Sequence, residues 1–129
     1  MIVVDSSVWI SRLHGFDTPE TQKFDDVDDF DDIILGDIVL LEILRGAQND
    51  QNAANIRRTL GRYEVVPMLS ADLAVKAAHN YRKLREHGKT ISKTPDLIIG
   101  TYCIEHGHSL LQRDKDYLPM AEHLGLKLT

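Results

Sequence analysis

Met1-Ile-Val-Val-Asp5 is a short apolar run that ends in an acid, and helical spacing follows it from Val8 to Leu13. Uninterrupted apolar runs of this length are typical of strands that are buried on both faces of a parallel sheet. Further short runs that predict strands lie at residues 33–35, 63–66, 109–111 and 126–128. Because helical patterns separate these runs, the sequence predicts a three-layer α/β/α sandwich around a parallel sheet of four to five strands.

Capping signals place the helices between the strands. Ser70 is a suitable N-cap for a long amphipathic segment that Gly88 ends. Thr94 is the expected cap of a later helix, with Pro95 in its first turn and Asp96 near its positive end. Further helices are expected from Pro19 to about Asp32, from Ile38 to Arg45, from Asp50 to Leu60 and from Tyr117 to Leu124. Without repeats or linkers, residues 1–129 are predicted to form a single domain.

The composition favours a globular domain without a targeting segment. The chain has 129 residues, of which 43% are hydrophobic, and this is enough to build a core. The single Cys103 excludes an internal disulfide, and its apolar neighbours predict a buried, inert thiol. A first strand beginning at Ile2 leaves no room for a signal peptide, and the apolar runs are too short to span a bilayer. We therefore expect a cytoplasmic protein without membrane association.

The charged residues are unevenly distributed, with a formal net charge of −5. Ten acids and one base lie between Asp17 and Glu42, and this acidic stretch predicts a solvated surface. Basic residues dominate from Lys76 to Lys93. The candidate contacts to a phosphate backbone in that segment are Arg82, Lys83 and Arg85. A merely solvated helix face is the alternative interpretation of the basic segment.

Acids also follow the carboxyl ends of the predicted strands. Asp5 ends the first strand, and Glu42 lies on the helix after the second. Asp96 begins the helix that leads into the fourth strand, and Asp114 and Asp116 follow that strand. Because open parallel sheets carry their sites beyond the carboxyl ends of the strands, we expect these acids to share one edge. Clustered carboxylates favour a divalent cation such as Mg²⁺ or Mn²⁺, which can activate water against a phosphodiester.

Each acid has a purely structural alternative. Asp5 could simply cap the helix that follows it. Glu42 could be a surface residue paired with Arg45. However, Glu42 is embedded in Val39-Leu-Leu-Glu-Ile-Leu44, an unusual position for a solvated acid. The complete set of acids, rather than any one of them, indicates a metal site.

Four segments match the motifs of a known family in order and in separation. They are Val3-Val-Asp-Ser-Ser-Val-Trp-Ile10, Gly36-Asp-Ile-Val-Leu-Leu-Glu-Ile-Leu-Arg-Gly46, Thr94-Pro-Asp-Leu-Ile-Ile-Gly100 and Leu110-Leu-Gln-Arg-Asp-Lys-Asp-Tyr117. Over nearly its whole length the chain resembles the PIN-domain ribonucleases, and more closely the VapC-like toxins of toxin–antitoxin pairs. It departs from the family at Gly100-Thr101, where Ala-Ala is usual.

The resemblance implies a catalytic site made of the predicted acids. Asp5 and Asp96 would hold Mg²⁺, for which Mn²⁺ could substitute, and Glu42 would complete the acidic cluster. The fourth acid would be Asp114 or Asp116, and we favour Asp114 as the metal ligand. Ser6 stands where a hydroxyl commonly supports the metal or the phosphate, so the resemblance assigns it to substrate binding.

The resemblance also implies a function and partners. The expected activity is that of a metal-dependent endoribonuclease, the toxin of a pair, which cleaves transfer RNA or another structured RNA. The expected partners are a cognate antitoxin that blocks the site and a second copy of the chain in a homodimer. The alternative is a non-catalytic PIN-fold module that binds protein or RNA.

Overall fold

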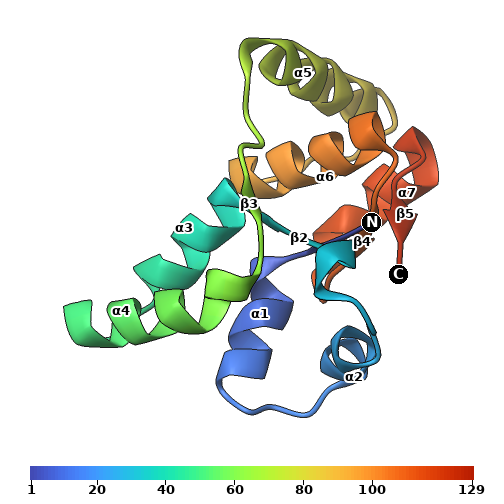
Figure 1. Cartoon of the computed structure of the whole chain (residues 1–129). Coiled ribbons are helices and arrows are strands. Elements are labelled where there is room, and N and C mark those ends of the chain that lie inside the picture. Colours follow the sequence, from blue (N-terminus) through green and yellow to red (C-terminus); the bar gives the residue numbers. More distant parts are fainter.

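The computed structural model describes residues 1–129 and contains one five-stranded parallel sheet (Figure 1). The strands lie in the order β3-β2-β1-β4-β5, and each neighbouring pair is parallel. Their bounds are β1 (Ile2–Val4), β2 (Ile33–Gly36), β3 (Val65–Val66), β4 (Ser109–Leu111) and β5 (Lys127–Leu128). The predicted parallel sheet is confirmed, with the higher of the two expected strand numbers.

Seven α-helices and three short 3₁₀ helices connect the strands. They are α1 (Ser6–Leu13), α2 (Pro19–Asp25), η1 (Phe30–Asp32), α3 (Asp37–Arg45), α4 (Asp50–Thr59), η2 (Leu60–Arg62), α5 (Ala71–Glu86), α6 (Thr94–His106), η3 (Lys115–Tyr117) and α7 (Leu118–Leu124). Figure 1 shows α5 and α6 on one side of the sheet and α1 and α2 on the other. This is the predicted α/β/α sandwich. None of its helices combines the length and the apolar character needed to cross a membrane.

The hydrophobic core surrounds β1, the central strand. Val4 is fully buried, as expected for a strand that is covered on both faces. Trp9 in α1 packs edge-on against Phe24 and Tyr63, with ring centroids 4.8 and 4.9 Å apart. The indole N–H of Trp9 donates to the carbonyl oxygen of Val4 at 3.1 Å. These contacts fix the start of α1 against the end of β1, where Asp5 lies.

The helix that we expected from Pro19 to Asp32 is shorter than predicted. α2 ends at Asp25, and after a short irregular segment Asp29 caps η1 by accepting a hydrogen bond from the backbone N–H of Asp31. Aspartate side chains compete for backbone donors in this way and therefore favour turns over helix interiors. The repeated acids of this segment end the helix early.

The predicted cap of α6 is wrong by one residue. Thr94 is itself helical, and Lys93 occupies the N-cap position without a side-chain capping bond. Pro95 is in the first turn as expected. The N–H groups of the first turn have no intrahelical partner, so a proline is tolerated at any position in that turn. Pro95 therefore locates the start of the helix only to within about one residue. Asp96 keeps its predicted place near the positive end of α6.

Residues 100 and 101 show how α6 packs against its neighbours. A Cβ atom at Gly100 would lie 2.5 Å from Sδ of Met120 in α7, so the glycine permits close approach. Thr101 is fully buried, and its hydroxyl accepts a hydrogen bond from Asn80 of α5 at 3.1 Å. Cys103 on the same helix is buried, and burial raises the pKa of its thiol to about 12. The thiol is therefore protonated at neutral pH, as predicted.

Candidate metal centre

Asp5 lies at the carboxyl end of the central strand and is 3% exposed. Its Oδ2 accepts hydrogen bonds from the backbone N–H of Ser7 at 3.3 Å and from the Ser7 hydroxyl at 2.8 Å. Its Oδ1 accepts a hydrogen bond from the hydroxyl of Tyr117 at 2.9 Å. The capping role that we considered for Asp5 is real, and it coexists with a position at the predicted edge of the sheet.

Asp96 reaches the same edge from the first turn of α6 and is 5% exposed. Its Oδ1 lies 3.3 Å from the hydroxyl of Tyr117. Its Oδ2 is buried and has no hydrogen-bond partner. A buried carboxylate oxygen without a partner is costly, because water no longer solvates it and nothing replaces the water.

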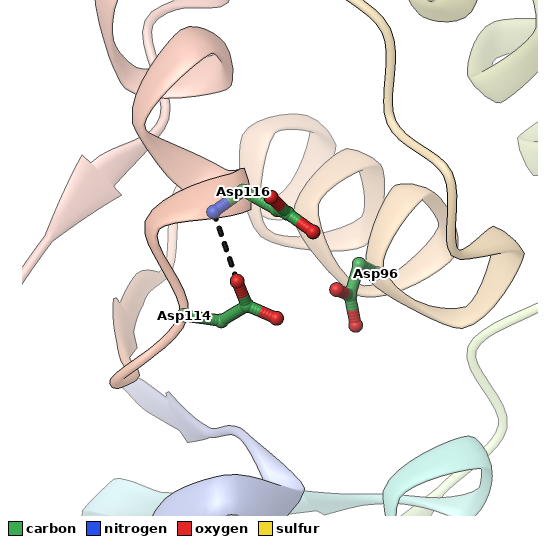
Figure 2. Close-up of side chains that lie close together, drawn as sticks. All are labelled: Asp96, Asp114 and Asp116. Atoms are coloured by element: carbon green, nitrogen blue, oxygen red, sulfur yellow. Dashed lines mark hydrogen bonds between the residues drawn. The ribbon is translucent and has the colours of Figure 1, made fainter.

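Asp114 and Asp116 join Asp96 in a group of three carboxylates. Each of the three offers an oxygen atom within 4.8 Å of the others, and Figure 2 shows the side chains around one space between η3 and the start of α6. Asp114 accepts a hydrogen bond from the backbone N–H of Asp116 at 2.9 Å. Its Oδ2 also pairs with Nζ of Lys93 at 3.1 Å. Such an all-oxygen group could bind a divalent metal.

Glu42 is half-buried on α3 and lies outside this group of three. Burial raises the pKa of Glu42, and the charge of Asp5 adds to the increase, while the nearby hydroxyl of Ser6 opposes it. Glu42 and Ser6 therefore lie on the Asp5 side of the edge. The surface ion pair between Glu42 and Arg45 does not form. Like Oδ2 of Asp96, Oε1 of Glu42 is buried without a hydrogen-bond partner.

The acids perturb one another electrostatically. Burial raises the pKa of Asp96 to about 7, and the charges of Asp5 and Asp114 contribute to the increase. Burial also acts to raise the pKa of Asp114, but hydrogen bonds from the backbone of Asp116 and from Lys93 outweigh it, so this pKa lies below its ordinary value. The edge therefore concentrates negative charge, with the ammonium group of Lys93 as its paired cation.

Three side chains of this centre were not predicted as parts of it. Tyr117 is fully buried between Asp5 and Asp96, and its only signal in the sequence is its place directly after two of the acids. The hydroxyl of Ser7 donates a hydrogen bond to Asp5. Lys93, which the sequence places only in a basic segment, forms an ion pair with Asp114. Burial and the charges of Asp5 and Asp96 raise the pKa of Tyr117, so its hydroxyl remains a donor.

The three basic residues predicted to bind substrate lie on α5. Arg82, Lys83 and Arg85 are all exposed. α5 runs antiparallel to α6, since Lys76 pairs with Glu105 at 3.0 Å and Asn80 contacts Thr101 one turn further along. The carboxyl-terminal half of α5 therefore runs beside the half of α6 that carries Asp96. No ion pair or hydrogen bond joins the three basic residues to the acidic centre.

This architecture defines a class of protein, an α/β/α sandwich whose parallel sheet carries an acidic centre that could bind a divalent metal. Residues 2–122 match the PIN domain family, and the chain belongs to that family. It is similar to VapC ribonuclease Mb1587 from Mycobacterium bovis and to Ribonuclease VapC11 from Mycobacterium tuberculosis. Each is 26% identical over 122 residues, which cover 91% of this chain and 89% of the relative.

Solved structures share the fold over the whole chain. VapBC2 from Rickettsia felis, bound to a DNA fragment from its promoter, gives a TM-score of 0.79 at 19% identity and covers 100% of this chain and 98% of that chain. FitAcB from Neisseria gonorrhoeae gives a TM-score of 0.77 at 17% identity and covers 99% of this chain and 96% of that chain. The likeness confirms the predicted PIN-like architecture.

The raised pKa of Asp96 predicts how stability depends on pH without metal. The pKa is about 7 in the folded protein against an ordinary 3.8, so the folded state holds this proton more tightly. The resulting stabilisation is complete below pH 3.8 and is lost as the pH rises towards 7. In chelator at neutral pH, Asp96→Asn should therefore be more stable than the wild type. One pKa unit corresponds to about 1.4 kcal/mol, so we expect a difference of a few kcal/mol.

Thermal unfolding of both proteins, measured from about pH 4 to about pH 7 in chelator, checks this prediction. The stability difference should grow steadily across that interval. Asp28→Asn, which changes an exposed acid outside the centre, is the matched control and should show no such growth. A pH-independent difference between Asp96→Asn and the wild type would contradict the assignment.

Proposed function

We propose that this chain is a Mg²⁺-dependent endoribonuclease, the toxin of a toxin–antitoxin pair, in which Mn²⁺ can substitute for Mg²⁺. The proposal is carried by two buried carboxylate oxygens of the acidic centre that have no hydrogen-bond partner. They are Oε1 of Glu42 and Oδ2 of Asp96. Buried acceptors require a donor or a cation, and the hard, oxygen-seeking Mg²⁺ suits these groups. The ribonuclease names of the similar mycobacterial proteins support the same activity.

Asp5 and Asp96 would hold the metal, with Asp114 as the further ligand and Glu42 completing the cluster. When bound, the metal activates water and neutralises charge on the phosphodiester. Glu42 is suited to accept the proton that the attacking water loses, because its pKa is raised towards neutral pH. Asp116 remains the alternative fourth acid, and Ser6 beside Glu42 would support the phosphate.

Replacing single acids should abolish RNA cleavage and leave the fold intact. Asp5→Asn, Glu42→Gln and Asp96→Asn each remove a charge that the metal needs without removing core volume. Loss of several kcal/mol of transition-state stabilisation corresponds to a loss of rate of at least about 100-fold. Cleavage of an RNA substrate in Mg²⁺ or Mn²⁺, with circular dichroism to confirm folding, measures the effect. Asp114→Asn should cause a larger loss than Asp116→Asn.

Asp28→Asn is the control for these variants and should cleave at the wild-type rate, because Asp28 is exposed and bonded to nothing in the centre. Full activity in Asp5→Asn or Asp96→Asn would show that the assigned site is wrong. A wild-type chain that cleaves no RNA with any divalent metal would instead favour the non-catalytic alternative, a PIN-fold module that binds protein or RNA.

We assign RNA binding to the exposed basic residues of α5, which run beside the half of α6 that carries Asp96. Reversing the charges of Arg82, Lys83 and Arg85 together should weaken RNA binding and flatten its dependence on salt. Each lost phosphate contact lowers the logarithmic salt slope by about 0.7 for single strands, so three contacts amount to about 2. Binding titrations at several salt concentrations measure the slope.

The matched control reverses Lys23 and Lys127, which are exposed basic residues of α2 and β5. It should leave the slope close to the wild-type value. If the α5 variant keeps the wild-type slope, the RNA follows another surface and the basic residues of α5 are only a solvated face.

The partner we propose is an antitoxin with an amphipathic segment. α3 presents apolar side chains to solvent, and Leu41 is 58% exposed. A hollow of the surface is lined by Asp37, Leu40, Leu41, Leu44 and Arg45. An apolar helix face could occupy it, while an Arg or Lys of the segment reaches Glu42 and Asp96. One of the solved structures with the same fold is a toxin–antitoxin complex. The expected homodimer and cytoplasmic location stay predictions.

Expression of the chain alone should arrest bacterial growth, and co-expression with its antitoxin should relieve the arrest and yield a complex on purification. Leu41→Asp should prevent co-purification, because it places a charge in the apolar contact. Leu118→Asp is the control, since Leu118 is similarly exposed but lies on α7, which contributes no residue to the hollow. Harmless expression of the lone wild-type chain would contradict the toxin assignment, and unchanged co-purification of Leu41→Asp would move the antitoxin to another surface.

A further inference from the structure

Tyr117 joins two acids that lie on different elements of the fold. Its side chain is fully buried at the end of η3. Its hydroxyl donates to Oδ1 of Asp5 at 2.9 Å and lies 3.3 Å from Oδ1 of Asp96. A phenolic hydroxyl carries one proton, so this single donor serves the two carboxylates unequally. The contacts connect the end of β1 to the start of α6.

The hydrogen bonds divide the four carboxylate oxygens into two sets. The Oδ1 atoms of Asp5 and Asp96 both face Tyr117. Oδ2 of Asp5 is oriented by Ser7, and Oδ2 of Asp96 has no partner. Because a carboxylate is planar, fixing one oxygen restricts the other. The hydroxyl thus determines which oxygen of Asp96 is left free for a cation.

The aromatic ring of Tyr117 is itself held in place. A Cβ atom at Gly100 would lie 3.8 Å from Cδ1 of this ring, so the ring lies against α6 one turn beyond Asp96. The backbone of η3 is fixed by Asp114, whose side chain caps it. Because the packing fixes the ring of Tyr117, its hydroxyl holds the carboxylates in one defined position.

We infer that Tyr117 is a positioning residue of the proposed metal centre, whose hydroxyl orients the carboxylates of Asp5 and Asp96 for the cation. The inference rests on the proposed function. A phenylalanine would fill the same space but leave Oδ1 of Asp5 and Oδ1 of Asp96 without the donor that they share. Groups that hydrogen-bond to metal ligands typically contribute about 10–100-fold to metal affinity. Tyr117 itself contacts neither the metal nor the substrate.

The test is Mn²⁺ binding to the full chain without RNA, measured by electron paramagnetic resonance for the wild type and for Tyr117→Phe. The dissociation constant should be weaker by about tenfold or more in Tyr117→Phe. The matched control is Tyr102→Phe, which removes the hydroxyl of another buried tyrosine, on α6, that makes no hydrogen bond to the acidic centre. Its Mn²⁺ affinity should equal that of the wild type.

Cleavage kinetics provide a second readout. The rate deficit of Tyr117→Phe should be largest at limiting Mn²⁺ and should shrink as Mn²⁺ approaches saturation. KM for RNA should stay unchanged, because a fully buried side chain does not touch the substrate.

Three other outcomes are possible, and each would contradict either the role of Tyr117 or the proposed function. Equal Mn²⁺ affinity in the wild type and Tyr117→Phe overturns the role of Tyr117 and leaves the metal site standing. A wild-type chain that binds no Mn²⁺ overturns the proposed function and this inference with it. Loss of cooperative thermal unfolding in Tyr117→Phe would show that the hydroxyl stabilises the fold, and this also overturns the positioning role.

Discussion

Carboxylates that are gathered at one edge of a sheet repel one another, and this repulsion is strongest where burial has removed the water that would screen it. The fold makes the repulsion unavoidable. β1 is the central strand, so Asp5 at its end lies beside whatever follows β4, and the backbone N–H of Asp5 bonds to the carbonyl of Leu111. Burial raises the pKa values of Glu42 and Asp96, and the repulsion between the carboxylates adds to the increase.

Helix N-termini, Lys93 and the hydroxyl of Tyr117 reduce the repulsion between the carboxylates without removing it. Asp5 caps α1, Asp114 caps η3 and also pairs with Lys93, and Tyr117 donates between two acids. These contacts use both carboxylate oxygens of Asp5 and of Asp114, but they leave Oδ2 of Asp96 and Oε1 of Glu42 buried and unpartnered. An arrangement that tolerates buried repulsion and retains free acceptors is less stable without a cation than with one. A divalent metal bound at this centre would relieve both costs together.

The sequence predicts most of the fold because strand burial and helix capping are local signals. The apolar run before Asp5 correctly predicts a buried strand, and the folded structure places this strand at the centre of the sheet. Local signals fail where side chains compete with the backbone, as Asp29 does when it caps η1. Asp5, Asp114 and Asp116 are predictable because they follow strand ends, and Asp96 because it lies at a helix start. Tyr117 and Lys93 are not, because their roles depend on acids that only the folded chain brings to them.

The uneven charge distribution is compatible with the proposed action of an acidic chain on RNA. The acids between α2 and β2 are exposed, as predicted for a solvated surface. The basic residues of α5 lie on another helix, alongside α6.

The central claim is that the acidic centre binds a catalytic metal. A crystal structure of the full chain in Mn²⁺, with anomalous scattering recorded, tests it most directly. We expect an anomalous peak in contact with Oδ2 of Asp96. Clear density for these side chains with no peak beside them would contradict it.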